Sequence, residues 1–424
     1  MKAAKSLVFV SLLVITAMLL GACAAPAPQT IEKVVTQIVE KKVDVVQTKV
    51  VEVEKKVEVV QTQVVEKIVE KQVEVTPTPG PANPYRPDNL FKLADELKAA
   101  TKSCTPPAGA KYALLTNAVA PFWTAAQVGA ARASAEINVP ITFQAPTAAD
   151  KLLQQLSMLE TFVSDKYNAI TFSAIDRVAA KSIVQKAVDG GIPVITTDSD
   201  ANGTARSIYV GMSDFDAGKA AGEAAKKIIG KGKVVGLVGY ATAQNAQDRI
   251  AGVKAAFEGT ELELVEVLLD DVKPELALSN AQTAMQKYPD LAGFVTFYSI
   301  DGPAACQAVK TAGKTGVVKI VAFDAEPATQ VCTQEGVVQA MIGQRVYFYG
   351  YLSGLIMQAM TCNGKDATMK LLEPYLSDWP SVATKDMAAG AEGKIHLNTG
   401  VDVIYGDTFP QYQEYLNSIG IPSQ

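Results

Sequence analysis

The sequence predicts an α/β protein with two similar lobes, each a parallel sheet flanked by helices, preceded by a valine-rich stalk. Beyond about residue 106, short apolar runs alternate with longer segments of helical periodicity, which is the pattern of a parallel sheet covered by helices. The alternation occurs in two consecutive series. Without its biased N-terminal part, the 424-residue chain is still long enough for two lobes with cores of their own.

The N-terminus has the features of an export leader. Two lysines provide a positive start, and residues 6–20 form an apolar run too short to span a membrane comfortably. Small residues then lead into Cys23, and this stretch resembles the lipobox of bacterial lipoproteins. The resemblance implies removal of a signal peptide at 1–22, lipidation of Cys23 and anchoring to the outer side of the cell membrane. An ordinary secretory leader cleaved near Ala25 is the alternative, and both place the protein outside the cytoplasm.

A stalk is expected next, because residues 31–75 consist almost entirely of Val, Glu, Lys, Gln and Thr. The segment 41–48 recurs fourteen residues later as 55–62, a spacing of two heptads. Its valines follow the 4-3-4-3 spacing of a coiled-coil seam, which would allow self-association. A helical stalk would reach about 65–70 Å at 1.5 Å per residue. A disordered or β-like spacer is the alternative, because valine is a poor helix former. The seam valines are Val39, Val43, Val46, Val50, Val53, Val57, Val60 and Val64.

Proline residues in 76–81 end the stalk, and an amphipathic helix is expected at 88–102. The cysteine, stalk and linker together occupy 23–88, and the globular part is expected to start near Pro106. Strands of the first series are expected at 112–116, 141–144, 169–172 and 194–196. Strands of the second series are expected at 234–238, 264–268, 294–297, 320–323 and 337–342.

Aromatic, carboxylate, amide and guanidinium side chains follow these strands in both series. Open α/β sheets bind ligands beyond the carboxyl ends of their strands, so we expect these side chains to converge. Such groups suit a polyhydroxylated ligand, because charged and amide groups bind hydroxyls and aromatic rings cover C–H faces. The residues are Phe122, Trp123, Ser173, Asp198, Asn245, Arg249, Tyr298, Asp324 and Gln344.

Each of these residues also has a purely structural interpretation. Phe122 and Trp123 are of a type that often packs in a core. Asp198 and Asp324 could cap helices, and Arg249 could form a surface ion pair of little energetic weight.

Composition excludes several classes of function. A net charge of -5 and a pI near 5.3 provide no basic face for nucleic acid. His396 is the single histidine, and the sequence contains neither a Gly-x-Ser-x-Gly elbow nor a Walker-type phosphate loop. We therefore expect a binding protein that needs no cofactor or metal, with carboxylate-only glycosidase chemistry as the enzymatic alternative.

Four cysteines lie beyond the leader, widely scattered and without the close pairs of a zinc site. Outside the cytoplasm they could form two disulfides with three possible pairings, or they could be buried thiols. They are Cys104, Cys306, Cys332 and Cys362.

From about residue 111 to 360 the chain resembles the type I periplasmic binding proteins for monosaccharides, the ribose- and xylose-binding group of ABC-importer receptors. Each of the motifs is weak alone, but their shared order and spacing are specific. The motifs are 120–123 (Ala-Pro-Phe-Trp), 193–200 (Pro-Val-Ile-Thr-Thr-Asp-Ser-Asp), 245–252 (Asn-Ala-Gln-Asp-Arg-Ile-Ala-Gly), 321–324 (Val-Ala-Phe-Asp) and 343–345 (Gly-Gln-Arg).

The resemblance implies a role for each candidate residue. Phe122 and Trp123 would cover the sugar ring, Asp198 would bind it with both carboxylate oxygens, and Ser173 would make a lesser contact. Asn245, Arg249 and Asp324 would bind hydroxyls from the second lobe, with Gln344 beside the hinge.

Three positions depart from the ribose binders. Tyr298 and Ala120 stand where ribose binders have asparagine, and Ser199 stands where they have arginine. These differences argue against ribose. The stretches 198–200 (Asp-Ser-Asp) and 343–347 (Gly-Gln-Arg-Val-Tyr) resemble more closely the xylose-binding branch and receptors for the autoinducer-2 signal.

The resemblance also implies three hinge crossings, near Met212, near Gln344 and within 365–399. The first lobe is assigned 89–212 plus 345–424, and the second 213–344. This assignment places Cys104 and Cys362 together in the first lobe and Cys306 and Cys332 together in the second. It therefore implies the disulfides Cys104–Cys362 and Cys306–Cys332.

The function expected is capture of a monosaccharide, with a pentose such as xylose favoured, by hinge closure and its delivery to the permease of an ABC importer. The alternatives are a sensory receptor for a sugar or autoinducer-2-like signal and, with less support, a carbohydrate-active enzyme.

Overall fold

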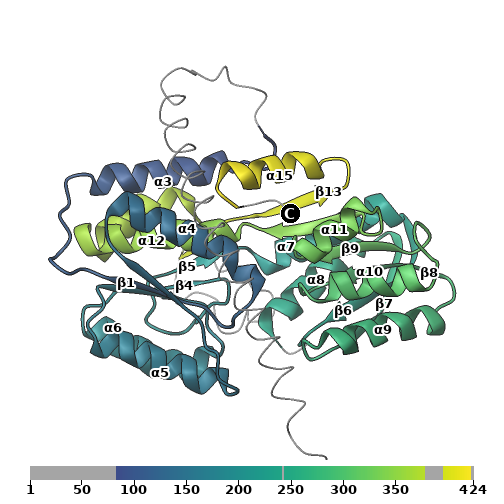
Figure 1. Cartoon of the computed structure of the whole chain (residues 1–424), viewed down its shortest axis with the longest axis horizontal. Helices are drawn as coiled ribbons and strands as arrows, with labels where there is room; N and C mark the ends of the chain where they lie inside the picture. Colours follow the sequence, from purple (N-terminus) through teal and green to yellow (C-terminus); the bar gives the residue numbers. More distant parts are fainter. Residues whose placement is uncertain (1–82, 241–242, 378–394, 422–424) are drawn as a thin grey trace, which may run out of the picture. The chain divides into compact units, whose positions relative to one another are not determined.

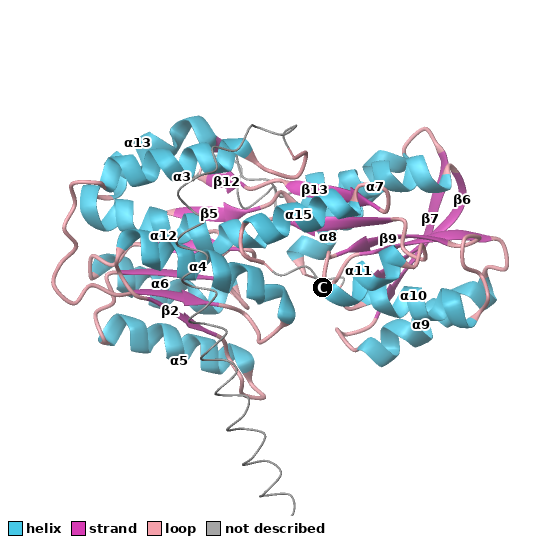
Figure 2. Cartoon of the chain, turned by 45° about the horizontal axis from the view of Figure 1, so that its top comes forward, coloured by secondary structure: helices cyan, strands magenta, loops and turns pink. Residues whose placement is uncertain are grey.

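Two sheets, each with helices on both faces, form the two lobes of the described chain (Figures 1 and 2). The structure is a computed structural model and describes residues 83–240, 243–377 and 395–421. The expected leader at 1–22, Cys23 and the stalk at 31–75 lie outside the described residues.

The first sheet has seven strands in the order β11-β12-β5-β4-β3-β1-β2, all parallel to their neighbours except β11. The four strands expected in this lobe are present as β1 to β4. Strand β5 was not expected, because it follows β4 after a short loop instead of a helix. The strands are β1 (Tyr112–Leu115), β2 (Ile141–Gln144), β3 (Ala169–Phe172), β4 (Val194–Thr197), β5 (Ile208–Gly211), β11 (Leu376–Ser377) and β12 (His396–Asn398).

The second sheet has six strands in the order β13-β10-β9-β8-β6-β7, and β13 alone is antiparallel to its neighbour. The five expected strands are present, and the last begins at Ala340 rather than at residue 337. The strands are β6 (Lys231–Val238), β7 (Glu261–Leu269), β8 (Leu291–Thr296), β9 (Lys319–Phe323), β10 (Ala340–Gln344) and β13 (Val401–Tyr405).

Helices connect the parallel strands, and several begin at side chains that accept hydrogen bonds from the first turn. Asp176 accepts from the main-chain N–H groups of Val178 and Ala179, and Ser213 accepts from that of Asp216. The helices are α3 (Asp88–Thr101), α4 (Thr124–Ile137), α5 (Lys151–Ser164), α6 (Arg177–Asp189), α7 (Asp214–Ile229), α8 (Gln244–Phe257), α9 (Pro274–Lys287), α10 (Asp301–Thr311), α11 (Pro327–Gln334), α12 (Val346–Asn363), α13 (Lys365–Leu372) and α15 (Phe409–Ser418), with 3-10 turns η1 (Pro121–Trp123) and η2 (Glu373–Tyr375).

Helix α3 belongs to the globular core, so the expectation of a start near Pro106 is wrong. Its residues Leu90, Leu93 and Leu97 are at most 1% exposed and pack in the cluster that includes α12. Upstream of the helix, Tyr85 is buried with its ring 5.3 Å from that of Tyr412 on α15. The fold therefore begins before residue 88, because the apolar face of this helix is buried against the first lobe.

The chain crosses between the lobes three times, after β5, after β10 and between β12 and β13. The third crossing lies at Thr399–Gly400, so β13 joins the second sheet beside β10. The assignment of all of 345–424 to the first lobe is therefore wrong for β13. The antiparallel return of a short strand to the other sheet leaves no strong pattern in the sequence.

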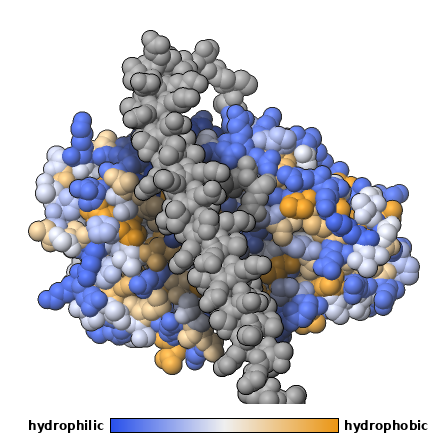
Figure 3. Space-filling view, in the orientation of Figure 1, coloured by the Kyte–Doolittle hydropathy of each residue, from blue (hydrophilic) through white to orange (hydrophobic). Residues whose placement is uncertain are grey.

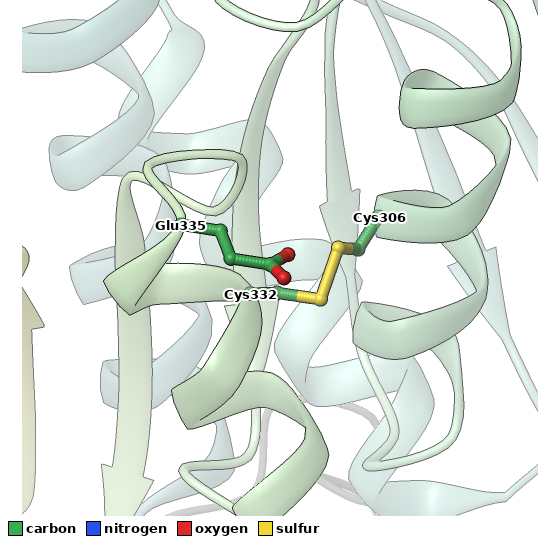
Figure 4. A group of neighbouring side chains, drawn as sticks. All are labelled: Cys306, Cys332 and Glu335. Carbon is green, nitrogen blue, oxygen red and sulfur yellow. A yellow bond between two sulfur atoms is a disulfide. The ribbon is translucent and has the colours of Figure 1, made fainter.

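Two disulfides join the pairs implied by the lobe assignment. Cys104 and Cys362 tie the end of α3 to α12, with their Cα atoms 5.8 Å apart. Cys306 and Cys332 tie α10 to α11 in the second lobe, with Cα atoms 6.3 Å apart (Figure 4). Glu335 lies beside the second disulfide. Because both thiols are consumed in the S–S bond, this trio is a structural crosslink and not a metal site.

Hydrophobic residues are scattered among hydrophilic ones on both lobes in the face drawn in Figure 3. Within the described residues, the helices all fall short of the length and apolar character needed to cross a membrane.

Candidate ligand-binding site

Asp198 follows β4 in a left-handed turn, with φ of 60°. The Ser173 hydroxyl donates to its Oδ2 at 2.8 Å, and the Asn117 amide donates to the same atom at 3.4 Å. The Tyr209 hydroxyl donates to its main-chain oxygen at 2.9 Å. Burial raises the pKa of Asp198 to about 7, because the charged form loses its hydration. The carboxylate is thus held in place while keeping acceptor capacity.

Asp200, two residues further on, anchors this loop. Its two carboxylate oxygens accept from Nε and Nη2 of Arg206 at 2.7 and 2.6 Å, and the Thr196 hydroxyl also donates to it. The ion pair is almost fully enclosed, with 1% and 2% of the two side chains exposed. Such a bidentate pair fixes the path of the chain beside Asp198.

Arg249 is presented from α8 by a close contact between two helices. A β-carbon at Gly218 on α7 would collide with the main-chain oxygen of Arg249, and one at Gly252 would collide with that of Phe215. These two glycines let α7 and α8 approach until Arg249 Nε bonds Asp214 at 2.9 Å. The alternative interpretation of Arg249 as part of a surface ion pair is wrong, because the arginine is buried, with only 5% of its side chain exposed.

The remaining groups around Arg249 fix its orientation. Its Nη1 donates to the main-chain oxygen of Phe297 at 2.7 Å, and its guanidinium lies 4.7 Å from the ring centre of Phe323. Asp214 follows the first hinge crossing and was not a candidate from sequence, because the strand before it was missed. Burial raises its pKa and the arginine opposes that effect.

Asp324 follows β9 and faces the same cluster from the second lobe. The Gln344 amide donates to its Oδ1 at 2.9 Å, and the Tyr349 hydroxyl donates to the Gln344 side-chain oxygen at 3.1 Å. Burial raises the pKa of Asp324 to about 6. Tyr349 lies within the apolar helix α12, so its polar role could not be read from sequence periodicity.

The cluster contains more negative than positive charge. Asp198 and Asp324 both interact electrostatically with Arg249 and with Asp214. Three carboxylates therefore share one guanidinium in a desolvated position between the lobes. Hydroxyl groups that donate to these carboxylates would relieve the cost of burial, whereas an anionic ligand would add to it.

Tyr298 and Asn245 line the second-lobe side. The Tyr298 hydroxyl donates to Asn245 Oδ1 at 3.2 Å, and its ring lies 6.0 Å from the Arg249 guanidinium. Burial raises the pKa of Tyr298 to about 12. This hydroxyl therefore remains a hydrogen-bond donor at any physiological pH.

The first-lobe aromatic residues have different positions. Phe122 is partly buried, whereas Trp123 is 4% exposed and packs against Ala126, Val346 and Tyr349. The Trp123 indole donates to Asn117 Oδ1 at 3.2 Å, so it orients the amide that reaches Asp198. Ser173 is fully buried and serves Asp198 as a donor.

Two cavities adjoin the carboxylate cluster, and residues of both lobes line each. The polar cavity, of about 260 Å³, contains Asp176, Asp198, Asp214, Asn245 and Asp248 in its wall. The apolar cavity has a volume of about 220 Å³, and its wall includes Phe122, Asp324, Gln344, Tyr347, Tyr412 and Leu416.

His396 has a structural environment. It is fully buried, its Nε2 lies 3.0 Å from the Gly211 oxygen, and its Nδ1 lies 2.9 Å from the Ser377 hydroxyl. Burial lowers its pKa to about 4, which makes it a poor proton acceptor at neutral pH. The arrangement holds β11 and β12 beside β5.

Residues 112–366, more than half of the chain, match a family model described as a periplasmic binding protein domain. A D-ribose/D-allose-binding protein of Pseudomonas aeruginosa is 27% identical over 197 residues, which cover 45% of this chain and 62% of that protein. A xylose/arabinose-binding protein of Sulfolobus acidocaldarius is 25% identical over 220 residues, covering 46% and 52%. The matches thus span less than two thirds of either relative.

Among solved structures, an arabinose-binding protein from Geobacillus stearothermophilus superposes with a TM-score of 0.59 at 25% identity, covering 72% of this chain and 99% of that one. A sugar-binding protein of a sugar ABC transporter from Bacillus halodurans gives a TM-score of 0.59 at 22% identity, covering 71% and 99%. The second likeness shows the fold alone.

Proposed function

Because the chain belongs to the periplasmic binding protein domain family, whose matched members include sugar-binding proteins of ABC importers, we propose that it captures one monosaccharide between its lobes for delivery to an importer permease. The observation that carries this proposal is the cluster of Asp198 from one lobe with Arg249 and Asp324 from the other. Each carboxylate is buried and keeps acceptor capacity, which suits a ligand rich in hydroxyl donors.

The ligand is an uncharged sugar in this proposal, and a pentose such as xylose is favoured. Three carboxylates around one arginine disfavour sugar acids and sugar phosphates. The names of the relatives, which include ribose, allose, xylose and arabinose binders, support the same class.

Hinge closure is the proposed mechanism. A sugar held by Asp198 and Arg249 makes contacts on both lobes that an open form lacks, so binding shifts the population toward the closed form. The three crossings, at Met212, Gln344 and Thr399, are the segments that would bend. The permease would then recognise the closed form, and the protein itself would carry out no chemistry on the sugar.

Attachment to the membrane completes the proposal. Members of this family work outside the cytoplasm, and Cys23 would add a lipid anchor there. The segment 31–75 would set the reach of the receptor and could associate with other copies through its valine seam.

The test is a ligand screen on the mature chain with Cys23→Ser, which keeps the protein free of lipid. Melting temperature and titration calorimetry would be measured with D-xylose, L-arabinose, D-ribose, D-allose, D-glucose and autoinducer-2. We expect one sugar to bind with one-to-one stoichiometry and to raise the melting temperature by mass action, without product formation. A fragment that begins at residue 106 is unsuitable, because it lacks the core helix α3 and Cys104. Failure of all these ligands, or turnover of a glycoside, would overturn the proposal.

A further inference from the structure

The apolar cavity extends beyond the groups expected to hold a monosaccharide. It shares Phe122, Asp324 and Gln344 with the expected sugar site and then continues to the C-terminal helix α15. Its far wall consists of Tyr412, Tyr415, Leu416 and Ile419 of this segment. The expected sugar site and this cavity therefore have Phe122, Asp324 and Gln344 in common.

The far wall has the character of a binding surface for a ring. Tyr412, Tyr415, Leu416 and Ile419 are at most 8% exposed, so this wall of the cavity is formed by aromatic and aliphatic side chains. A cavity of about 150 Å³ with an apolar lining is large enough to hold benzene. At about 220 Å³, this cavity has room for one six-membered ring in addition to its shared edge with the sugar site.

Within the described part of the chain, two side-chain oxygens of this cavity wall have no hydrogen-bond partner. Glu326 Oε1 and Gln330 Oε1 are buried and have no hydrogen-bond partner among the residues that the structure describes. The Gln330 amide donates to the Ala325 oxygen at 2.9 Å, which fixes the side chain on this wall. A ligand that donates a hydrogen bond here would remove the cost of a buried, unsatisfied acceptor.

These observations separate the cavity from a simple packing defect. Empty cavities in a core are lined by apolar groups, whereas this space combines an apolar wall with two unpaired acceptors and the Asp324 carboxylate. A free monosaccharide bound at Asp198, Arg249 and Asp324 would leave the far wall uncovered.

We propose that the site takes a glycoside, a sugar that carries a second ring, with the sugar at the carboxylate cluster and the second ring against α15 in the apolar cavity. The second ring is an aromatic aglycone or another sugar, because both present an apolar face with hydroxyl donors at the edge. This inference rests on the proposed sugar-binding function and names a narrower substrate class for the same site.

The first experiment needs no variant. Titration calorimetry on the mature Cys23→Ser chain would compare D-xylose, L-arabinose, D-glucose and D-galactose with the methyl and phenyl glycosides of each, in both anomers, and with xylobiose and cellobiose. For the sugar that binds, we expect one phenyl glycoside to bind about tenfold tighter than the free sugar, because its ring leaves water. The methyl glycoside controls for loss of the anomeric hydroxyl and should gain little. Disaccharide binding that exceeds phenyl glycoside binding would identify the second ring as a sugar.

A second experiment fills the cavity. Leu416→Trp should weaken the phenyl glycoside at least about tenfold while changing free-sugar affinity less than about threefold, because the indole would occupy the space of the second ring. Val317→Trp, at a 70% exposed position in the second lobe, is the matched control and should change neither affinity.

The outcomes distinguish this inference from the function on which it depends. If no free sugar and no glycoside binds, the proposed function falls and the inference falls with it. If the free sugar binds but every ring-bearing glycoside binds more weakly, the inference alone is overturned. A phenyl glycoside that binds tightly and remains unaffected by Leu416→Trp would also overturn it, since the ring would then lie elsewhere.

Discussion

The two lobes hold their shares of the site by different means. In the first lobe, neutral donors surround Asp198, and a separate buried ion pair, Asp200–Arg206, fixes the loop. In the second lobe, the binding groups themselves are paired, because Arg249 bonds Asp214 and Gln344 bonds Asp324. In the first lobe, one set of residues anchors the loop and another belongs to the binding site. In the second lobe, the same residues do both. A substitution in the first lobe can therefore separate stability from affinity.

Loss of the Asp200–Arg206 ion pair should have the largest of the expected effects, and it should act on the free energy of unfolding. Asp200→Ala removes the bidentate acceptor of the buried Arg206 and should lower the free energy of unfolding by about 3–5 kcal/mol. Urea unfolding at pH 7.5 measures it. Glu160→Ala, which removes an exposed ion pair in the same lobe, is the control and should cost less than about 1 kcal/mol. Equal effects of the two variants would remove the distinction between anchoring and binding groups.

Arg249 should have the next largest effect, and it should act on affinity. Arg249→Ala removes the one guanidinium that balances three carboxylates, so sugar binding should weaken by about 2–4 kcal/mol. Calorimetric titration with the sugar identified by the screen measures the change. Arg132→Ala alters a partly exposed arginine paired with Glu136 and should leave the affinity unchanged.

Sugar affinity and folding stability should both depend on pH, and acidification should change them in opposite directions. The pKa is about 7 for Asp198 and about 6 for Asp324, both raised by burial. The ionised forms accept hydroxyl hydrogen bonds, so affinity should fall at least about tenfold from pH 7.5 to 5.5. The stability of the ligand-free protein should depend on pH in the opposite direction. These groups bind protons more tightly when folded, so their contribution to stability decreases as pH rises from about 4 to 7.

Calorimetry and urea unfolding across this pH range test both trends. Asp198→Asn should flatten the affinity profile above pH 6, because the group with the higher pKa no longer titrates. Affinity that rises on acidification would contradict the assignment of ionised carboxylates as the acceptors.

The smallest effect on sugar binding is expected outside both lobes. Cys23→Ser should move the protein from the membrane fraction to the soluble fraction, because the lipid anchor would be lost. Its sugar affinity should match that of the lipidated protein within about twofold, since binding depends on the two lobes. A protein that stays on the membrane would point to another means of attachment.

The same contrast describes what the sequence could predict. Asp198, Arg249 and Asp324 were predictable, because each follows a strand whose apolar run is recognisable, and the structure brings them into one cluster. Asp214 was not, since β5 lies so close to β4 that no helical segment separates them. Tyr349 was hidden in the continuous apolar pattern of α12. Position alone did not reveal the role of Trp123, because its buried indole orients Asn117 beside Asp198.

The third crossing was the least predictable part of the fold. β12 and β13 are short, and β13 returns antiparallel to the other sheet across Thr399–Gly400. Pairing of this kind depends on contacts distant in sequence, which local periodicity does not encode.

Titration calorimetry on Asp198→Ala, beside the wild type and Arg249→Ala, tests the central claim most directly, because these residues come from opposite lobes. If the sugar bridges the lobes, each substitution should weaken binding by about 2–4 kcal/mol with the fold intact. Unchanged affinity in both variants would contradict the site described here.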